Sequence, residues 1–323
     1  PRGRMKSRTR IKTAVVGVGY LGRLHAQKYA MLDGAEFVGV FDADPSRAET
    51  VAAEFKTKAF HDMKDLFGKV DAVSVVTPTE HHYKVGMEFL SRGVHVMMEK
   101  PITATTDEAR SLVAEAKRTG AVLQVGHLER FNGAMAALGN RINKPIFIEA
   151  FRLSPFPNRS TDVDVVLDVM IHDIDLVLSM ADSEVADVEA AGLPVVSPGK
   201  ADFANARVTF RNGCVASITA SRVSKERARK INVFQPGTII SIDYGAQGLT
   251  ITNTVHGAPG TTATQIDEEV AVEKKDAIFE ELKSFLDSIA TGRPPAVSGD
   301  DGLRALELAE RIQQALKAGT SGR

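Results

Sequence analysis

Two kinds of hydrophobic pattern divide the chain near residue 126. Before it, short runs that are apolar on both faces alternate with segments whose apolar residues recur every three or four positions. Strands buried on both faces and separated by helices are typical of a doubly wound parallel sheet. The expected strands are Thr13–Val18, Glu36–Phe41, Ala72–Val76, Val94–Met98 and Val122–Val125, and the expected helices are Leu21–Met31, Ser46–Glu54, Glu80–Ser91 and Thr105–Thr119.

After residue 126 the pattern changes to strands with few helices between them. A connecting helix over Arg130–Asn140 leads to a strand over Pro145–Leu153, a loop and a long apolar helix over Val163–Ala181. Alternating polar and apolar residues with frequent turn signals then predict a large, mostly antiparallel sheet. Its further strands are Val185–Ala191, Ala206–Phe210, Val215–Ser221, Lys230–Phe234, Thr238–Asp243 and Leu249–Thr252, and closing helices cover Asp276–Ala290 and Gly302–Ala318, with a break at Thr291–Pro295.

The first predicted strand runs into a glycine-rich turn, Gly17-Val18-Gly19-Tyr20-Leu21-Gly22, that opens a helix. Gly17 permits a tight turn, Gly19 a close approach of backbone to a pyrophosphate, and Gly22 close packing of helix and strand. Asp42 ends the second strand, twenty residues past Gly22. A carboxylate there accepts hydrogen bonds from a ribose diol and repels a 2′-phosphate, so the sequence predicts a Rossmann domain that binds NAD in preference to NADP.

Ligands of such sheets bind beyond the carboxyl ends of the strands. The candidate cofactor-binding residues therefore lie in the segments that follow the strands. They are Gly17, Gly19, Tyr20, Leu21, Gly22, Asp42, Thr77, Pro78, His82, Glu99 and Lys100. For His82 a role in opening the next helix is the competing interpretation.

Two further groups carry candidate chemistry. Lys100 follows the strand expected to end near the nicotinamide, where an ammonium can bind a substrate oxygen; a solvated surface lysine is the alternative. Asp168, His172 and Asp175 follow helical spacing on an otherwise apolar helix. A carboxylate beside a histidine suits proton transfer, while a solvent-facing edge and a zinc site are the alternatives. Among these alternatives we expect no metal, and whether Asp168 or Asp175 is the partner of His172 stays open at this point.

Substrate contacts are expected from the segment after the last strand of the first domain and from the start of the second. The candidates are His127, Arg130, Asn132, Arg152, Asp168 and His172. We expect three segments: a NAD-binding domain over 11–127, a substrate-binding and oligomerisation domain over 128–290, and a C-terminal segment over 291–323.

Composition restricts the partners. The 323 residues are 43% hydrophobic and carry a formal net charge of −1, which gives no reason to expect nucleic acid or an anionic membrane as partner. No apolar run reaches the length of a membrane span, and we expect no signal peptide before the first strand. Cys214 is the only cysteine, so we expect a reducing, cytoplasmic location. Residues Pro1–Arg4 before Met5 are read as non-native.

Several motifs together resemble the glucose–fructose oxidoreductase/inositol dehydrogenase/MocA family over nearly the whole chain. They are Gly17–Gly22, Asp42, Thr77-Pro78, Glu99-Lys100-Pro101 and Asp168–Asp175. The segments Gln124–Asn132 and Leu167–Asp173 are similar to a narrower branch of nucleotide-sugar 3-dehydrogenases, from which Gly133 departs because proline is expected there.

The resemblance implies a Rossmann domain joined to a large, mostly antiparallel sheet that often serves in oligomerisation, as dimer or tetramer. It implies NAD(P)-dependent oxidation or reduction of a sugar or polyol carbon, and it matches Lys100, His172 and Asp168 to the family's active-site residues. The branch indicates C3 of a UDP-N-acetylhexosamine such as UDP-N-acetylglucosamine. An inositol, polyol or free-sugar dehydrogenase and a non-catalytic nicotinamide-sensing regulator are the alternatives.

Overall fold

A computed structural model describes residues 10–156, 164–255 and 263–320 of the chain. Residues Pro1–Arg4, much of the loop after Leu153 and Val163, the expected start of a long helix, lie outside the described residues. The chain divides into two compact units, of which the first comprises residues 1–127 and 276–303 and the second residues 128–275 and 304–323.

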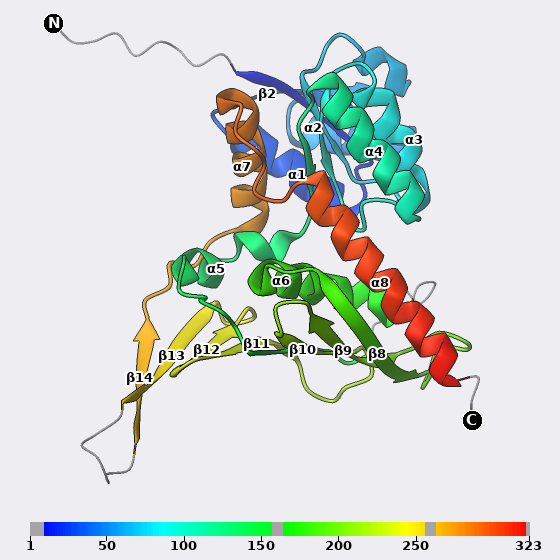
Figure 1. Ribbon diagram of the computed structural model, residues 1–323. Coiled ribbons are helices and arrows are strands. Elements are labelled where there is room, and N and C mark those ends of the chain that lie inside the picture. The colour runs from blue at the N-terminus through cyan, green and yellow to red at the C-terminus, as the bar shows by residue number, and fades with distance from the viewer. Residues whose placement is uncertain (1–9, 157–163, 256–262, 321–323) are drawn as a thin grey trace, which may run out of the picture. The chain divides into compact units, whose positions relative to one another are not determined.

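The first unit contains a six-stranded sheet in the order β3-β2-β1-β4-β5-β6, in which every pair is parallel. Figure 1 labels β2 of this sheet. Its short central strands are almost fully buried, which explains their uninterrupted apolar sequence. The strands are β1 (Ile11–Val16), β2 (Ala35–Phe41), β3 (Lys58–Phe60), β4 (Ala72–Val75), β5 (His95–Met98) and β6 (Leu123–Val125). The expected strands are confirmed, and β3 was missed because an edge strand of three residues has almost no pattern.

Four helices connect the strands, as the apolar periodicity predicts. They are α1 (Tyr20–Met31), α2 (Pro45–Glu54), α3 (Thr79–Leu90) and α4 (Thr106–Thr119), with a short 3₁₀ helix η1 (Met63–Leu66). The local sequence determines where two of them begin. Asp44 accepts backbone N–H groups at the start of α2, and Thr105 and Glu108 form a capping box at the start of α4.

The helix α7 (Ala277–Thr291) belongs to the first unit, whereas the expected second domain extends to residue 290. Its apolar face supplies Leu282, Phe285 and Leu286 to the buried core beside α1 and β1. Lys28 of α1 pairs with Asp276, the residue that caps α7, at 2.7 Å. The hydrophobic face of α7 therefore assigns this helix to the first unit. Sequence position alone does not show which domain that face packs against.

The second unit is built on an eight-stranded sheet in the order β14-β13-β12-β11-β7-β10-β9-β8. All neighbours are antiparallel except β7 and β10, so the expectation of a mostly antiparallel sheet is confirmed. The strands are β7 (Phe147–Leu153), β8 (Val185–Leu193), β9 (Phe203–Phe210), β10 (Val215–Ser221), β11 (Ala228–Gln235), β12 (Thr238–Asp243), β13 (Gly248–Val255) and β14 (Thr264–Val270). The last was missed because Thr264–Glu269 is polar and exposed and shows no alternation.

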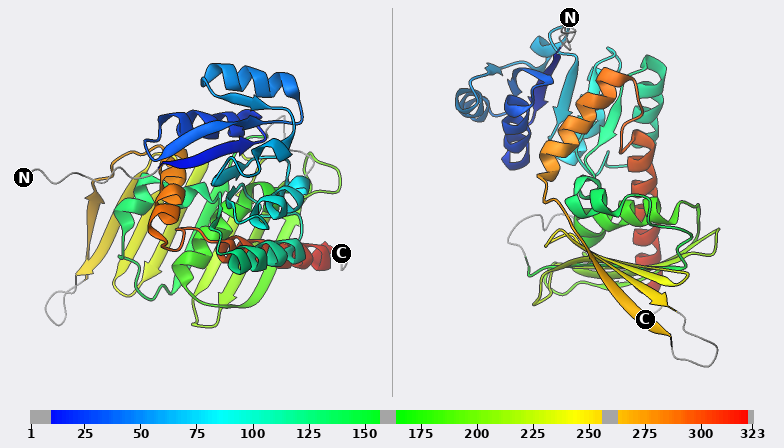
Figure 2. Two further views of the ribbon diagram at one scale, coloured as in Figure 1. Left: turned by 90° about the horizontal axis from the view of Figure 1, so that it is seen from above. Right: turned by 90° about the vertical axis from the view of Figure 1, so that its left-hand side faces the viewer.

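Helices of the second unit lie on one face of this sheet (Figure 2). They are the 3₁₀ helix η2 (Leu128–Phe131), α5 (Gly133–Leu138), the π-helical η3 (Val166–Met170), α6 (Ile171–Ala181) and α8 (Gly299–Thr320), of which α8 begins in the first unit. The expected helix over Arg130–Asn140 is divided because Asn132 leaves helical geometry to cap α5. No helix in the described part of the chain is long and apolar enough to cross a membrane.

Candidate active site

The glycine-rich turn between β1 and α1 has the geometry that a dinucleotide requires. Gly17 has φ of +86°, and a side-chain Cβ there would lie 2.7 Å from the Val76 carbonyl oxygen. A Cβ on Gly22 would overlap the carbonyl oxygen of Gly17, so both positions need glycine. At Gly19 no heavy atom lies within 4 Å of the added Cβ. The turn is therefore tight at both ends and open in the middle, where a pyrophosphate needs room at the start of α1.

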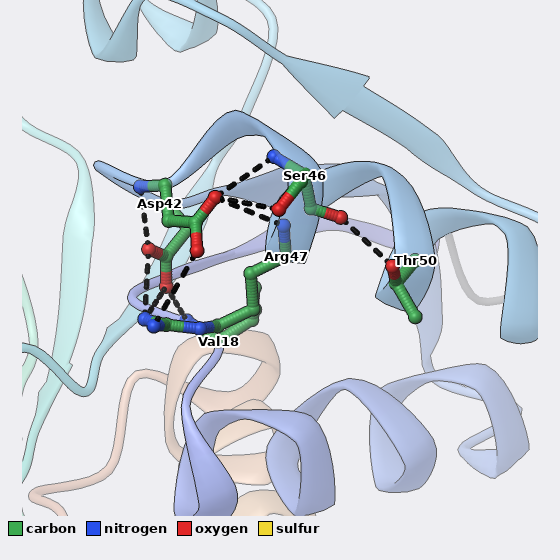
Figure 3. Close-up of polar contacts among 6 residues, drawn as sticks. Val18, Asp42, Ser46, Arg47 and Thr50 are labelled. Atoms are coloured by element: carbon green, nitrogen blue, oxygen red, sulfur yellow. Dashed lines mark hydrogen bonds and ion pairs between the residues drawn. The ribbon is translucent and has the colours of Figure 1, made fainter.

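Asp42, at the end of β2, is buried and tied to this turn (Figure 3). Its Oδ2 accepts the Val18 N–H at 2.8 Å, and its Oδ1 accepts the Asp44 N–H at 2.9 Å. The Arg47 guanidinium lies 3.1 Å from Oδ1 and is half-exposed. Sequence reasoning missed Arg47, although a cation five residues past the acidic position is a recognisable signal for binding a 2′-phosphate. In this chain Asp42 neutralises that cation, which favours NAD.

His82, on α3, is buried and joins the loops that follow β4 and β5. Its two ring nitrogens lie 2.8 Å from the Thr77 carbonyl oxygen and 2.9 Å from the Pro101 carbonyl oxygen. Burial lowers the pKa of His82, while the two carbonyl groups act in the opposite direction. His82 therefore holds together the Thr77-Pro78 and Lys100-Pro101 segments, and its contact with the cofactor stays a prediction.

Glu99 and Lys100 follow β5 and differ in the burial of their side chains. The Glu99 side chain is buried, and its Oε2 accepts the backbone N–H of Lys100 at 3.2 Å. A Cβ on Gly126 would lie 3.0 Å from this carboxylate, so glycine at that position makes room for it. The Lys100 side chain is half-buried. Cofactor contact by Glu99 stays a prediction.

The predicted catalytic residues of the second unit lie where a π-helical turn meets α6. Asp168 lies in η3 and His172 in the first turn of α6, and both side chains are half-buried. A π-turn has more residues per turn than an α-helix, and such turns are frequent at functional sites. That Asp168 and His172 share one face stays a prediction. Asp175 is buried, and its carboxylate receives both the Nε and the terminal N–H of Arg130, at 2.6 and 2.9 Å.

A second arginine holds the same helix. Arg152 of β7 donates two hydrogen bonds to Asp173, at 2.9 and 2.8 Å, and a third to Glu129 at 2.8 Å. The two acidic groups raise the pKa of Arg152 although burial alone would lower it. Arg130 and Arg152, which the sequence predicts as substrate-binding, are thus engaged by carboxylates within the second unit. Asp173 and Glu129 were missed as their partners, although a charged residue in an apolar helix signals a buried pair.

The remaining substrate candidates, His127 and Asn132, are also buried. His127 ends the first unit and is 2% exposed. Asn132 caps α5 and donates to the Tyr244 carbonyl oxygen at 3.2 Å. Gly133, the departure from the expected proline, donates its N–H to Gln247 at 3.2 Å. A Cβ there would collide with the Glu273 carbonyl oxygen, so this glycine suits its surroundings and proline would not.

The strand order 3-2-1-4-5-6, the glycine turn and Asp42 together define a dinucleotide-binding domain of the Rossmann type. Sequence comparison agrees. The profile of the GFO/IDH/MocA oxidoreductase family with an NAD-binding Rossmann fold matches residues 11–127, and that of the GFO/IDH/MocA C-terminal domain matches residues 141–240. The chain belongs to the glucose–fructose oxidoreductase/inositol dehydrogenase/MocA family of oxidoreductases, and its cofactor is NAD.

Individual relatives narrow the comparison. UDP-N-acetylglucosamine 3-dehydrogenase of Acidithiobacillus ferrooxidans is 42% identical over 313 residues, 95% of this chain and 98% of the relative. A solved structure of that enzyme superposes with a TM-score of 0.90 at 41% identity, covering 96% of this chain and 98% of the other. Myo-inositol 2-dehydrogenase of Thermotoga maritima is 27% identical over 95% of this chain and 96% of the relative.

Proposed function

We propose that this protein is an NAD-dependent dehydrogenase that oxidises the C3 hydroxyl of a UDP-N-acetylhexosamine, with UDP-N-acetylglucosamine as the preferred substrate. The observation that carries the proposal is the 42% identity to the A. ferrooxidans 3-dehydrogenase over nearly the full length of both chains. The inositol dehydrogenases are more distant, at 25–29% identity, and leave oxidation of a polyol as the second candidate.

In the proposed reaction His172 accepts the proton of the sugar hydroxyl and Asp168 orients its imidazole. Lys100 donates a hydrogen bond to the same oxygen and stabilises the negative charge that develops on it. NAD, when bound, accepts the hydride. Three structural features support these assignments: the half-buried placement of Lys100 after β5, the π-turn at Asp168 and the ion pairs that hold α6.

The substrate assignment is tested by NADH formation at 340 nm with UDP-N-acetylglucosamine, UDP-N-acetylgalactosamine, free N-acetylglucosamine and myo-inositol. The proposal expects kcat/KM for the UDP-sugars to exceed that for the free sugar and inositol by at least about 10²-fold, because contacts to the remote UDP group lower the transition-state energy. Equal or higher kcat/KM with myo-inositol would establish the polyol candidate instead. Product analysis by NMR identifies the oxidised carbon.

We also propose that the sheet face opposite α6 packs against a second copy of this chain. Phe147, Phe151, Phe234 and Ile239 alternate with buried residues and lie half-exposed on this face, which no helix in the described part of the second unit covers. A wide sheet face with aromatic groups is unusual for a surface in contact with water. Analytical ultracentrifugation is expected to show a dimer or tetramer for the wild type and a shift toward monomer for Phe234→Asp. A monomeric wild type would contradict this.

The proposed location is the cytoplasm. Cys214 is a buried, free thiol, and the chain has no second cysteine with which to form an internal disulfide. A reducing compartment that contains NAD fits both the thiol and the cofactor. Fractionation of cells that express a tagged protein tests the location.

A further inference from the structure

A cluster of three titratable side chains is buried in the first unit, and one of them, Glu99, accepts the backbone N–H of Lys100. His25 comes from α1, Glu99 follows β5, and Glu281 comes from α7. Their exposed fractions are 1%, 8% and 1%. The potential ligand atoms of all three lie within 4.8 Å of one another. Three elements that are far apart in sequence thus bring two carboxyl groups and one imidazole into a dry environment.

The contacts within the cluster differ between the two carboxyl groups. Glu99 Oε1 lies 3.2 Å from Nε2 of His25, and Glu99 Oε2 accepts the backbone N–H of Lys100 at 3.2 Å. Glu281 Oε1 is buried and has no hydrogen-bond partner among the described residues. The backbone N–H of Lys100 thus supports an ionised Glu99, whereas an ionised Glu281 would lie beside a like charge with its Oε1 unpaired.

Electrostatics supports the same division. Burial, followed by the negative charge of Glu99, raises the pKa of Glu281 well above its usual value. Burial also acts to raise the pKa of Glu99, but His25 and then the charge of Lys100 hold it below its usual value. When two carboxyl groups share a dry site, one of them keeps its proton. Other titratable groups that act on the cluster are Tyr29 of α1 and His82 of α3.

We propose that His25, Glu99 and Glu281 act as one positioning unit for Lys100, in which Glu281 stays a neutral acid while Glu99 stays a carboxylate that holds the Lys100 backbone. None of the three is assigned contact with the sugar. This cluster fixes the segment Glu99–Pro101 through the hydrogen bond from the Lys100 backbone to Glu99. His82 of α3 adds a contact to the Pro101 carbonyl oxygen. The effect of this cluster on turnover rests on the proposed catalytic role of Lys100. The prediction that Glu281 keeps its proton does not depend on that role.

The proton on Glu281 has a defined consequence for stability. An acid whose pKa is raised in the folded state contributes stability below the pKa of the unfolded chain, and this contribution is lost as pH rises toward the folded pKa. In that interval the native state holds one proton more than the unfolded state. The ratio of the unfolding constants of wild type and Glu281→Gln should therefore rise about tenfold per pH unit above about pH 4.5.

The test is urea unfolding of the full-length protein from pH 4.5 upward for wild type, Glu281→Gln and the control Glu280→Gln. Glu280 is half-buried one position earlier on the same helix. The control ratio should lack the tenfold rise. Parallel pH dependence of wild type and Glu281→Gln would overturn the proposal. This result does not depend on any substrate, so it separates failure of the positioning unit from failure of the proposed enzyme activity.

Kinetics tests the positioning role. Glu281→Ala should lower kcat on UDP-N-acetylglucosamine about tenfold or more, because small displacements of a catalytic group are costly, whereas NAD affinity should change little. Glu281→Gln, the isostere of the neutral acid, should restore most of kcat. Equal losses in both variants would contradict a neutral acid, and the Gln variant remains informative if the Ala variant does not fold.

Metal content distinguishes the proposed positioning role of this cluster from a metal-binding role. One imidazole and two carboxylates also form a ligand set for a divalent ion such as zinc. The proposal expects inductively coupled plasma mass spectrometry of the purified protein to show no stoichiometric transition metal. One bound ion per chain in the wild type and none in Glu281→Gln would overturn the proposal in favour of a metal site.

Discussion

The two units hold buried carboxylates near their candidate site residues in different ways. In the second unit Asp173 and Asp175, both on α6, receive paired N–H groups from Arg152 and Arg130. In the first unit Asp42 and Glu99, which follow β2 and β5, accept backbone N–H groups of the adjoining loops. Two-pronged arginine contacts fix the orientation of a helix. Contacts from backbone N–H groups instead fix the conformation of the loops next to which the cofactor is expected.

The largest loss of stability is expected when an arginine that pairs with the carboxylates of α6 is removed. Arg152→Leu leaves the buried Asp173 and the half-buried Glu129 without this cation, which should lower the free energy of unfolding by about 3–5 kcal/mol. Urea unfolding measures the loss. Arg211→Ala is the control, because its pair with Glu184 is exposed, at 72% and 76% of the side chains, and should contribute less than about 1 kcal/mol. Equal losses in the two variants would show that the buried network adds no stability.

A smaller effect is expected from the backbone-held side. Asp42→Ala removes the anion that neutralises Arg47 and leaves the guanidinium to bind a 2′-phosphate. The ratio of kcat/KM for NAD to that for NADP should fall by a factor of about 10–100, the range for losing and gaining charge-assisted hydrogen bonds. Steady-state kinetics with both cofactors measures it.

The double variant Asp42→Ala/Arg47→Ala provides the control for this change. It should lose NAD activity as Asp42→Ala does, but without the gain with NADP. An unchanged cofactor ratio in Asp42→Ala would show that the cation near β2 has no part in cofactor choice.

The smallest effect is expected for an ion pair nearer the surface. Lys28 and Asp276 join α1 to the start of α7 at 2.7 Å, with 13% and 50% of their side chains exposed. Lys28→Ala should lower the free energy of unfolding by about 1 kcal/mol or less, because solvent screens the pair. The measurement is urea unfolding, as for Arg152→Leu. A loss as large as that of Arg152→Leu would contradict the distinction between buried and surface charge.

Patterns that are local in sequence predicted most of the fold. Buried strands, capped helices and the glycine turn each depend on neighbouring residues, and they lie close to where the sequence predicts them. The edge strands β3 and β14 and the π-turn at Val166–Met170 were missed. A strand of three residues or a wholly exposed strand carries little hydrophobic pattern, and a π-turn depends on packing around the helix.

At the candidate site, the sequence predicted which residue types are needed more readily than which side chains contact one another. Gly17 and Gly22 follow from backbone sterics alone, and their surroundings agree with that reasoning. That Arg152 binds Asp173, or that Glu281 lies beside Glu99, depends on the pairing of strands and helices distant in sequence. Charged residues in apolar segments signal that a partner exists, but only the fold identifies it.

The central claim is that Lys100 and His172 carry the chemistry of an NAD-dependent sugar dehydrogenase. Lys100→Met and His172→Asn test it most directly when kcat on UDP-N-acetylglucosamine and NAD affinity by titration calorimetry are measured on the same preparations. Each variant should lose about 10²–10⁴-fold in kcat while its NAD affinity remains close to that of the wild type. Folded, NAD-binding variants that retain kcat within tenfold of the wild type would contradict it.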